Sequence, residues 1–416
     1  MPLIVQKYGG TSVGDAARIK NVARRLLDTQ REGARVVGVI SAMAGVTDNL
    51  LKLSREMSDD PTDRELDVLL STGERAASAL TAMAINALGG KAISLTGADA
   101  GILTDGTHTK ARIANISPRR IHELLAEDYI VVVAGFQGQS PQGEITTLGR
   151  GGSDLTAIAL AGALNADACQ IFTDVDGVFT CDPRVIKDAA KVDEIAYDEL
   201  LEMAGAGSKV MQSRAVEFAK KFGVEFEVRS SFKPQPGTIA REETPNMEDV
   251  VIRGISLDRK QAKLTVAGVP DQAGAAARIF SMVAAHHIIV DMIVQSAAIE
   301  GKIDISFTIH EDELEDARKV LMPVVSEIEA NRLNTTSGAA KLSVVGIGMR
   351  SHAGVAARFF ECLGKADINV QLISTSEIKI AVLIDGAKAD KAAQIIHEEF
   401  GLARLAPTLA ATKPLG

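Results

Sequence analysis

Residues 149–173 read GRGGSDLTAIALAGALNADACQIFT and join a glycine-rich loop to a helix and a strand. Small apolar residues at 155–164 predict the helix, and the run 168–173 predicts the strand. The three glycines of the loop expose backbone N–H groups, and Arg150 offers a bidentate fork for a carboxylate. Asp154 stands where the helix begins, but a capping role alone would explain neither the arginine nor the glycines. We therefore interpret the loop as a ligand-binding element.

The same alternation of strands and helices extends in both directions along the first 230 residues. Apolar and β-branched runs predict buried strands, and amphipathic or Ala/Leu-rich segments predict helices. The predicted strands include 3–6, 36–40 and 130–134, and the predicted helices include 15–28 and 66–88. Buried strands that alternate with helices indicate an α/β fold with a mostly parallel sheet covered on both faces.

A second architecture follows a polar segment that begins with KPQPG at 233–237. The sequences LTVAGVPDQAGAAARIF, from 264, and LSVVGIGMRSHAGVAARFF, from 342, form an internal repeat. Each copy continues as strand, strand and helix, which predicts two ferredoxin-like βαββαβ modules. The second copy lacks a last strand, and a strand at 250–255 would complete it if the first copy is inserted within the second. The predicted domains are 1–240, a linker with the completing strand at 241–263, and modules at 264–337 and 338–416.

The composition is that of a globular protein, with 46% hydrophobic and 24% charged residues among 416. A formal net charge of −9 argues against binding of nucleic acid or an anionic membrane through bulk charge. Three cysteines without C-x-x-C spacing predict neither a disulfide framework nor a metal site. No apolar run is long enough to span a membrane and no signal peptide is recognisable, so we expect a cytoplasmic protein.

Other loops also carry groups suited to an anionic ligand. Each has a structural alternative, such as a tight turn, a capped helix start or a plain Asp-Gly turn. These loops are KYGGTS at 7–12, SAMAGVT at 41–47, STGER at 71–75, TDVDGVF at 173–179, CDPR at 181–184 and GAGSK at 205–209. No G-x-x-x-x-G-K-[ST], G-x-G-x-x-G or G-x-S-x-G motif occurs, which disfavours P-loop proteins, dinucleotide-binding proteins and hydrolases.

Taken in this order, KYGGTSVG, SAMAGVT, STGER, GRGGSD, TDVDGVFTCDPR and the tandem modules resemble the aspartate kinases of the amino-acid kinase superfamily, which carry two C-terminal ACT domains. The resemblance covers nearly the whole chain. It implies a three-layer αβα kinase domain followed by two ferredoxin-like ACT domains. The implied reaction is transfer of the γ-phosphoryl group of ATP to the β-carboxylate of L-aspartate. The product, 4-phospho-L-aspartate, opens the route to diaminopimelate, lysine, threonine, methionine and isoleucine.

The resemblance also assigns roles to individual residues. Lys7, Arg150 and Asp154 would be catalytic. The residues expected to hold aspartate are Ser41, Thr47, Glu74, Arg150, Gly151, Ser153 and Asp154. The residues expected around ATP are Lys7, Tyr8, Gly9, Gly10, Ser12, Thr173, Asp174, Phe179, Asp182, Arg184, Lys209 and Val210. Mg²⁺ would arrive with ATP, and no protein residue is assigned to it.

The ACT pair implies feedback by lysine, threonine or both, and a homodimer or tetramer formed through these domains. The implied effector residues are Asp271, Ala273, Gly274, Asp291, Met292, Gln295, Ala353, Gly354, Asn369, Val370, Ser376 and Glu377. The sequence departs from the family pattern at Gln272 and Ala273, where Lys-Pro is frequent, and at Val290, where Asn is frequent. One effector site would therefore be weak or specialised. Met247 is a candidate internal start for a separate small subunit.

Two alternative functions stay open. Arg150 and Glu74 favour an α-amino acid as acceptor without excluding glutamate, so a different amino-acid kinase is the first alternative. The second is a catalytically inactive sensor that uses its ACT pair to bind an amino acid. Release of ADP on addition of aspartate would separate a kinase from a sensor.

Overall fold

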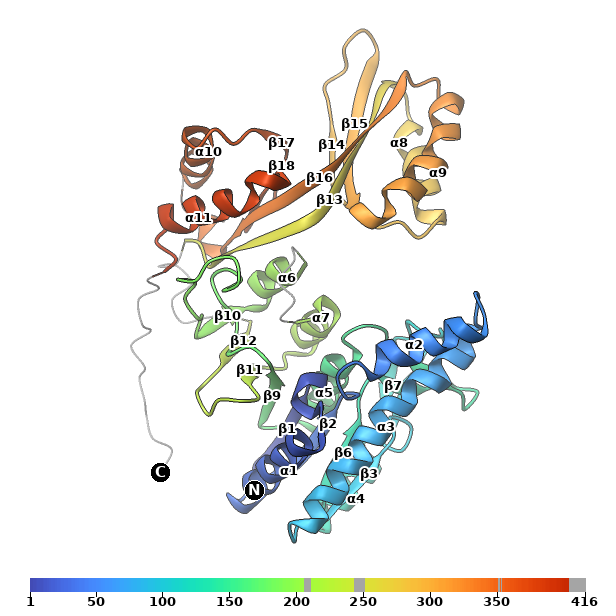
Figure 1. The fold of residues 1–416 in the computed structure, drawn as a ribbon, viewed down its shortest axis with the longest axis vertical. Helices are drawn as coiled ribbons and strands as arrows, with labels where there is room; N and C mark the ends of the chain where they lie inside the picture. Colours follow the sequence, from blue (N-terminus) through green and yellow to red (C-terminus); the bar gives the residue numbers. More distant parts are fainter. Residues whose placement is uncertain (206–210, 243–250, 351, 353, 404–416) are drawn as a thin grey trace. The chain divides into compact units, whose positions relative to one another are not determined.

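A computed structural model describes residues 1–205, 211–242, 251–350, 352 and 354–403. The chain divides into two compact units (Figure 1). The first contains residues 1–178 and 191–204 together with the described residues 211–242. The second contains residues 179–190 and the described residues from 251 onward.

An eight-stranded sheet forms the centre of the first unit. Its strands lie in the order β10-β12-β11-β9-β1-β2-β6-β3, and every neighbouring pair is parallel except β11 and β12. The strands are β1 (Leu3–Tyr8), β2 (Arg35–Ile40), β3 (Ala92–Leu95), β6 (Ile130–Ala134), β9 (Ala168–Thr173), β10 (Glu194–Ala196), β11 (Phe226–Ser230) and β12 (Thr238–Arg241). The predicted mostly parallel sheet is thereby confirmed.

Strand β1 lies between β2 and β9, so the chain order reverses at β1. In open α/β sheets the crevice at the carboxyl ends of the strands beside such a reversal is the usual ligand site. A small four-stranded sheet, in the order β5-β4-β7-β8, adds loops near this edge. Its strands are β5 (Ile113–Ile116), β4 (Ile102–Thr104), β7 (Gln137–Gln139) and β8 (Ile145–Thr147).

Helices cover both faces of the large sheet. Tyr8 belongs to a core with α1 and α3, whereas its neighbour Lys7 reaches Asp154 on α5. Successive side chains of a strand point to opposite faces, so α5 lies on the face opposite α1 and α3. The helices are α1 (Ala16–Arg31), α2 (Val46–Met57), α3 (Asp63–Ala87), α4 (Arg119–Ala126), α5 (Gly152–Leu164), α6 (Tyr197–Gly205) and α7 (Ser213–Phe222), with the short η1 (Gly10–Val13).

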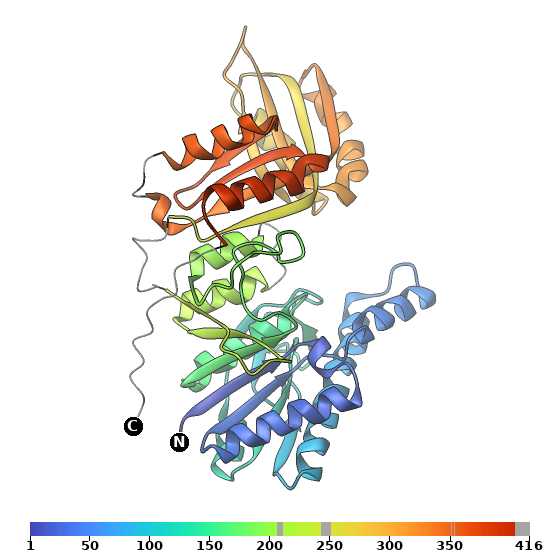
Figure 2. The same cartoon turned by 60° about the vertical axis from the view of Figure 1, so that its left-hand side comes forward.

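The second unit contains one antiparallel sheet in the order β14-β15-β13-β16-β18-β17. The strands are β13 (Gly254–Pro270), β14 (Val290–Gln295), β15 (Lys302–His310), β16 (Arg332–Val345), β17 (Val370–Thr375) and β18 (Lys379–Asp385). The helices are α8 (Ala275–Ala285), α9 (Leu314–Glu327), α10 (Val355–Lys365) and α11 (Ala389–Glu399), with the short turns η2 (Glu311–Glu313), η3 (Ile347–Arg350) and η4 (Gly386–Lys388). Figure 2 shows β13 and β16, in yellow and orange, running side by side.

The two long strands are shared by both repeats. The first residues of β13, 254–258, pair with 341–345 of β16, and residues 263–267 pair with 332–336. The strand missing from the second repeat is therefore supplied by residues that precede the first repeat, and the first repeat is inserted in the second. This strand begins at Gly254, slightly later than the predicted 250–255.

Residues 179–190 leave the first unit and pack in the second. Cys181 and Ile186 belong to a core with Val344 and Phe359, and the backbone oxygen of Thr180 accepts a hydrogen bond from the N–H of Ile255 at 2.7 Å. Apolar side chains in this excursion explain the placement, because burial there removes them from water. The sequence-based division at residue 240 does not separate this segment.

Candidate active site

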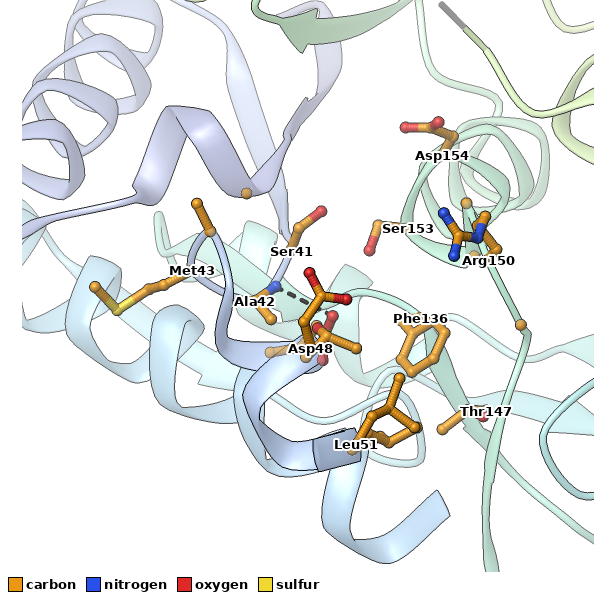
Figure 3. A pocket seen from close by; sticks show the side chains of 18 of the residues that line it. Ser41, Ala42, Met43, Asp48, Leu51, Phe136, Thr147, Arg150, Ser153 and Asp154 are labelled. Carbon is orange, nitrogen blue, oxygen red and sulfur yellow. Dashed lines mark hydrogen bonds between the residues drawn. The ribbon is translucent and has the colours of Figure 1, made fainter. Parts of the chain in front are cut away.

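A pocket of about 440 Å³ lies at the carboxyl edge of the first unit's sheet. This volume is in the range of small-molecule sites. Figure 3 shows Ser41 and Asp48 on one side of it and Arg150 and Asp154 on the other. The loops after β1 and β2, one face of α3 and the start of α5 form its walls. The lining includes the predicted residues Lys7, Gly10, Ser41, Thr47, Glu74, Arg150, Gly151, Ser153 and Asp154.

Lys7 and Asp154 form an ion pair at the base of this region. The ammonium nitrogen lies 2.5 Å from Oδ1 of Asp154, and each residue is only 8% exposed. Burial makes such a pair sensitive to the loss of either partner, because the remaining charge is left without compensation. The pair therefore holds one positive and one negative group at the end of β1 and the start of α5.

The loop after β1 requires glycine for close backbone contact. A Cβ atom on Gly10 would lie 2.9 Å from the backbone oxygen of Ala42, and the Gly10 oxygen accepts the N–H of Ala44 at 3.1 Å. Tyr8 is buried and stacks on Phe172 at 4.8 Å, so only its backbone is available to a ligand. Gly9 donates its N–H to Phe172 O, and Ser12 Oγ lies 2.5 Å from Ser231 Oγ.

Glu74 projects from α3 into the pocket with one oxygen unpaired. Its Oε1 accepts the backbone N–H of Ala42 at 3.1 Å, while the buried Oε2 has no hydrogen-bond partner among the described residues. Burial raises the pKa of Glu74 to about 7, and the hydrogen bond from Ala42 opposes part of that rise. An unpaired carboxylate oxygen in a pocket is suited to a cationic ligand group.

The GRGGSD loop forms a tight turn into α5. Gly151 has a φ of 72° at the N-cap, and a Cβ there would lie 1.6 Å from Cγ of Gln212. Only glycine fits such a position, because both the backbone conformation and the space exclude a side chain. The turn presents the exposed Arg150 at the pocket wall.

Two residues that support the pocket, the buried Asp67 and the half-buried Arg214, were not predicted from the sequence. Asp67 on α3 accepts hydrogen bonds from Thr109 and Thr147, which both line the pocket. Arg214 donates to the backbone oxygens of Leu148 at 2.6 Å and Ala111 at 2.9 Å. Neither residue gave a usable signal in the sequence, because the partners of both lie far away along the chain.

Several residues expected around ATP lie outside this pocket. Thr173 ends β9, next to β1, and its hydroxyl donates to the carboxylate of Asp174 at 3.2 Å. Phe179, Asp182 and Arg184 lie in the excursion that belongs to the second unit, where the carboxylate of Asp182 pairs with the guanidinium of Arg184 at 2.7 Å. Lys209 and Val210 are outside the described residues, as are the effector candidate Ala353 and the candidate start Met247.

Two of the predicted effector residues occupy equivalent places in the two repeats. Gly274 and Gly354 are the left-handed N-caps of α8 and α10, with φ of 95° and 97°. Asp291 pairs with Lys341, which is buried, and Met292 is buried against Leu372. Asp271 and Ala273 precede α8, Gln295 ends β14, Asn369 and Val370 stand at the start of β17, and Ser376 and Glu377 follow it.

In the described part of the chain, no group of three or more His, Cys, Asp and Glu residues is arranged to hold a metal ion. None of the helices in the same residues combines the length and the apolar character required to cross a membrane.

Comparison with known proteins agrees with this geometry. Residues 2–230 match the amino acid kinase family, and residues 264–322 and 342–400 match the ACT domain. The aspartokinase of Mycolicibacterium smegmatis is 49% identical over 408 residues, and the aspartate kinase of Pseudomonas fluorescens is 50% identical over 405. These alignments cover 97% of this chain and 97% and 98% of the relatives.

Solved structures give the same result. Aspartokinase III of E. coli in complex with aspartate and ADP, in its R-state, superposes with a TM-score of 0.80 at 26% identity, over 95% of this chain and 99% of that one. The same enzyme with lysine and aspartate, in its T-state, gives 0.77 at 27% identity, over 96% and 99%.

Fold, pocket and matches together define an amino-acid kinase followed by a pair of ACT domains. Within that class, the resemblance to curated relatives extends along almost the entire chain. The chain belongs to the aspartate kinases, which phosphorylate the β-carboxylate of L-aspartate.

Proposed function

We propose that the pocket binds aspartate between α3 and the GRGGSD turn. Arg150 clamps the α-carboxylate, because its guanidinium can donate two parallel hydrogen bonds to a carboxylate. Glu74 faces the α-ammonium with its unpaired oxygen, and Ser41, Thr47 and Ser153 supply hydroxyls along the walls. The unpaired Oε2 of Glu74, in a pocket that also presents Arg150, is the observation that carries this proposal.

Lys7 is proposed to act on the transferring phosphoryl group. The β-carboxylate is already a nucleophile, so the reaction needs no general base, but it must approach an anionic γ-phosphate. Positive charge and backbone N–H groups offset that repulsion, and in-line positioning supplies much of the remainder. Lys7 lies at the end of β1 beside Gly9 and Gly10, and Asp154 holds its ammonium in place.

ATP is the proposed phosphoryl donor, as supported by the ADP in the E. coli relative. The β1–η1 loop and the nearby end of β9, with Thr173 and Asp174, are the proposed nucleotide-facing elements. Mg²⁺ is proposed to bind mainly through the phosphates of ATP, because Mg²⁺ in phosphoryl-transfer sites is usually held by the substrate phosphates and only one or two carboxylates. When bound, it neutralises phosphate charge.

A hydroxylamine trap tests the activity. The purified protein is incubated with MgATP, hydroxylamine and one acceptor at a time, and an acyl phosphate is trapped as a coloured hydroxamate. We expect a signal with aspartate and none with glutamate or N-acetylglutamate. A signal only with another acceptor would contradict aspartate as the substrate. No signal from folded, ATP-binding protein would favour the alternative of a catalytically inactive amino-acid sensor.

Regulation by lysine, threonine or both is proposed for the ACT pair. The lysine in the T-state structure of the E. coli relative supports lysine, and the two glycine-capped turns at Gly274 and Gly354 are the candidate sites. Inhibition is measured with each amino acid and with both. If Val290 weakens one site, Val290→Asn strengthens inhibition, whereas Asn369→Ala weakens it. Unchanged inhibition in both variants would show that the effector binds at another site.

A further inference from the structure

A buried carboxylate group accepts hydrogen bonds from residues that line one end of the pocket. Asp67 is fully buried on α3, seven residues before Glu74. Both of its oxygens lie 3.1 Å from the backbone nitrogen of Thr109, and Oδ1 accepts the hydroxyl of Thr147 at 2.5 Å. Oδ2 lies 2.7 Å from Nδ1 of His108. A buried charge is weak evidence for stabilisation, so its partners are the better guide to its use.

One of those partners has an unusual backbone conformation. Thr109 has a φ of 63°, in the left-handed region. A β-branched residue rarely adopts this region and persists there only when its surroundings hold it. The two-centre hydrogen bond from its N–H to Asp67 is such a restraint. Thr109 also lines the pocket, so its conformation shapes the binding surface.

The segment around Thr109 lies directly against the turn that carries Arg150. A Cβ on Gly149 would lie 3.2 Å from the backbone oxygen of Thr109, which is closer than most such contacts. The N–H of Ala111 donates to Thr147 O at 2.9 Å. Arg214 joins the same two segments by its bonds to Ala111 and Leu148. A shift of residues 108–111 would therefore displace the turn.

We propose that Asp67 is a positioning residue for aspartate binding. Its carboxylate holds Thr109 in the left-handed conformation, and Thr109 in turn fixes the turn that presents Arg150. Asp67 touches no substrate in this arrangement and acts through the backbone. The inference rests on the proposed role of Arg150 as the carboxylate clamp.

The test uses Asp67→Asn, Thr109→Gly and the double variant in the full-length enzyme. Asp67→Asn replaces the acceptor Oδ2 by a donor, so the hydrogen bonding that restrains the backbone of Thr109 is weakened. Aspartate KM is expected to rise at least ten-fold, while ATP KM changes less than two-fold. Glycine adopts positive φ without restraint. Thr109→Gly added to Asp67→Asn should therefore lower aspartate KM again by at least three-fold.

Two further variants keep the test decisive. Asp99→Asn makes the same chemical change at an exposed carboxylate that binds Thr96, and should leave both KM values within two-fold of wild type. If Asp67→Asn does not fold, His108→Ala is the substitute. It removes the contact of His108 with Asp67, which weakens the restraint on Thr109, and should raise aspartate KM alone by two- to five-fold.

The outcomes separate this inference from the activity itself. Wild-type enzyme without turnover on aspartate would contradict the proposed function. Active wild type with an unchanged aspartate KM in Asp67→Asn would overturn the role of Asp67. Equal rises in both KM values, or no recovery in the double variant, would also overturn it, because a merely structural role predicts those results.

Discussion

The ammonium of Lys7 and the carboxylate of Asp154 are 2.5 Å apart, and they connect the end of β1 to the first turn of α5. Lys7 and Tyr8 are adjacent, but Tyr8 points into the core on the other face of the sheet. This alternation aims the lysine at the pocket, and the aspartate restricts it to one position. The lysine is thereby preorganised, so little reorganisation is needed when an anionic group arrives.

We expect Lys7→Ala and Asp154→Ala each to lower the rate by at least about 10²–10³-fold, the usual cost of losing one preorganised charged or hydrogen-bonding group. Circular dichroism should show a retained fold. Hydroxamate formation at saturating MgATP and aspartate is the measurement. Because each single variant leaves a buried charge unpaired, the two losses should not add in the double variant. Near-normal turnover in either single variant would show that the substituted residue has no catalytic role.

Glu74 predicts a pH dependence of aspartate binding. Its pKa is raised from 4.5 to about 7 by burial, so the carboxyl group is mostly protonated in the free enzyme below pH 7. Only the ionised form attracts the ammonium of aspartate. Aspartate KM should therefore fall as the pH rises from 6 to 8 and then level off. Glu74→Gln should raise KM at pH 8 and flatten the profile; a profile with the wild-type slope would contradict the role of Glu74.

The raised pKa of Glu74 also predicts how the stability of the unliganded enzyme depends on pH. A carboxyl group whose folded pKa exceeds its unfolded pKa binds more protons in the folded state. Its contribution to stability is complete below about pH 4.5 and is lost as the pH rises to about 7. Above pH 7, Glu74→Gln should therefore have a higher Tm than wild type in the absence of aspartate. Thermal unfolding at pH 5 and pH 8 measures this, and an equal Tm difference at both values would exclude Glu74 as its source.

Much of the pocket could be predicted because its residues lie in short glycine-containing loops. Lys7, Ser41 and Arg150 each stand in or beside such a loop at a strand or helix end, where local sequence determines conformation. The inserted arrangement of the repeats was also predictable, since one copy lacked a strand and an apolar run preceded the other. In the structure, Lys7, Ser41 and Arg150 line one pocket.

Other features depend on contacts distant in sequence and could not be predicted. Asp67 reads as an ordinary charge on a helix until residues 108–109 and 147 pack against it. Arg214 donates hydrogen bonds to backbone carbonyl oxygens. Every residue has such an oxygen, so the sequence does not show which ones an arginine will contact. The excursion at 179–190 follows directly on the TDVDGV turn, and only packing with Phe359 and its neighbours shows that it belongs to the second unit.

Two glycines in the first loop make a matched pair. A Cβ on Gly10 would lie 2.9 Å from the rigid backbone oxygen of Ala42, whereas a Cβ on Gly14 would first meet the flexible guanidinium of Arg18 at 3.4 Å. Gly14 also has an ordinary helical φ of −64°. We expect Gly10→Ala to raise KM for both substrates at least ten-fold by moving the loops after β1 and β2 apart. Gly14→Ala should change neither by more than two-fold, and equal effects would refute the steric argument.

The ion pair between Asp291 and Lys341 predicts a stability change in the second unit. Lys341 is only 3% exposed, so Asp291→Ala leaves a buried ammonium without its partner. Such losses reach about 3–5 kcal/mol for fully buried pairs. The Asp291 side chain is 35% exposed, and water will therefore reduce the cost to about 1–3 kcal/mol.

Thermal unfolding of Asp291→Ala, Lys341→Met and the double variant measures this prediction. Lys341→Met removes the buried charge and leaves an aspartate that water can reach, so it should destabilise less than Asp291→Ala. Adding Lys341→Met to Asp291→Ala should restore most of the lost Tm, because no unpaired charge then remains in the sheet. Asp316→Ala is the control, since its bond to Lys319 joins two highly exposed side chains and should change Tm little. If the two single effects simply add, the pair does not couple β14 to β16.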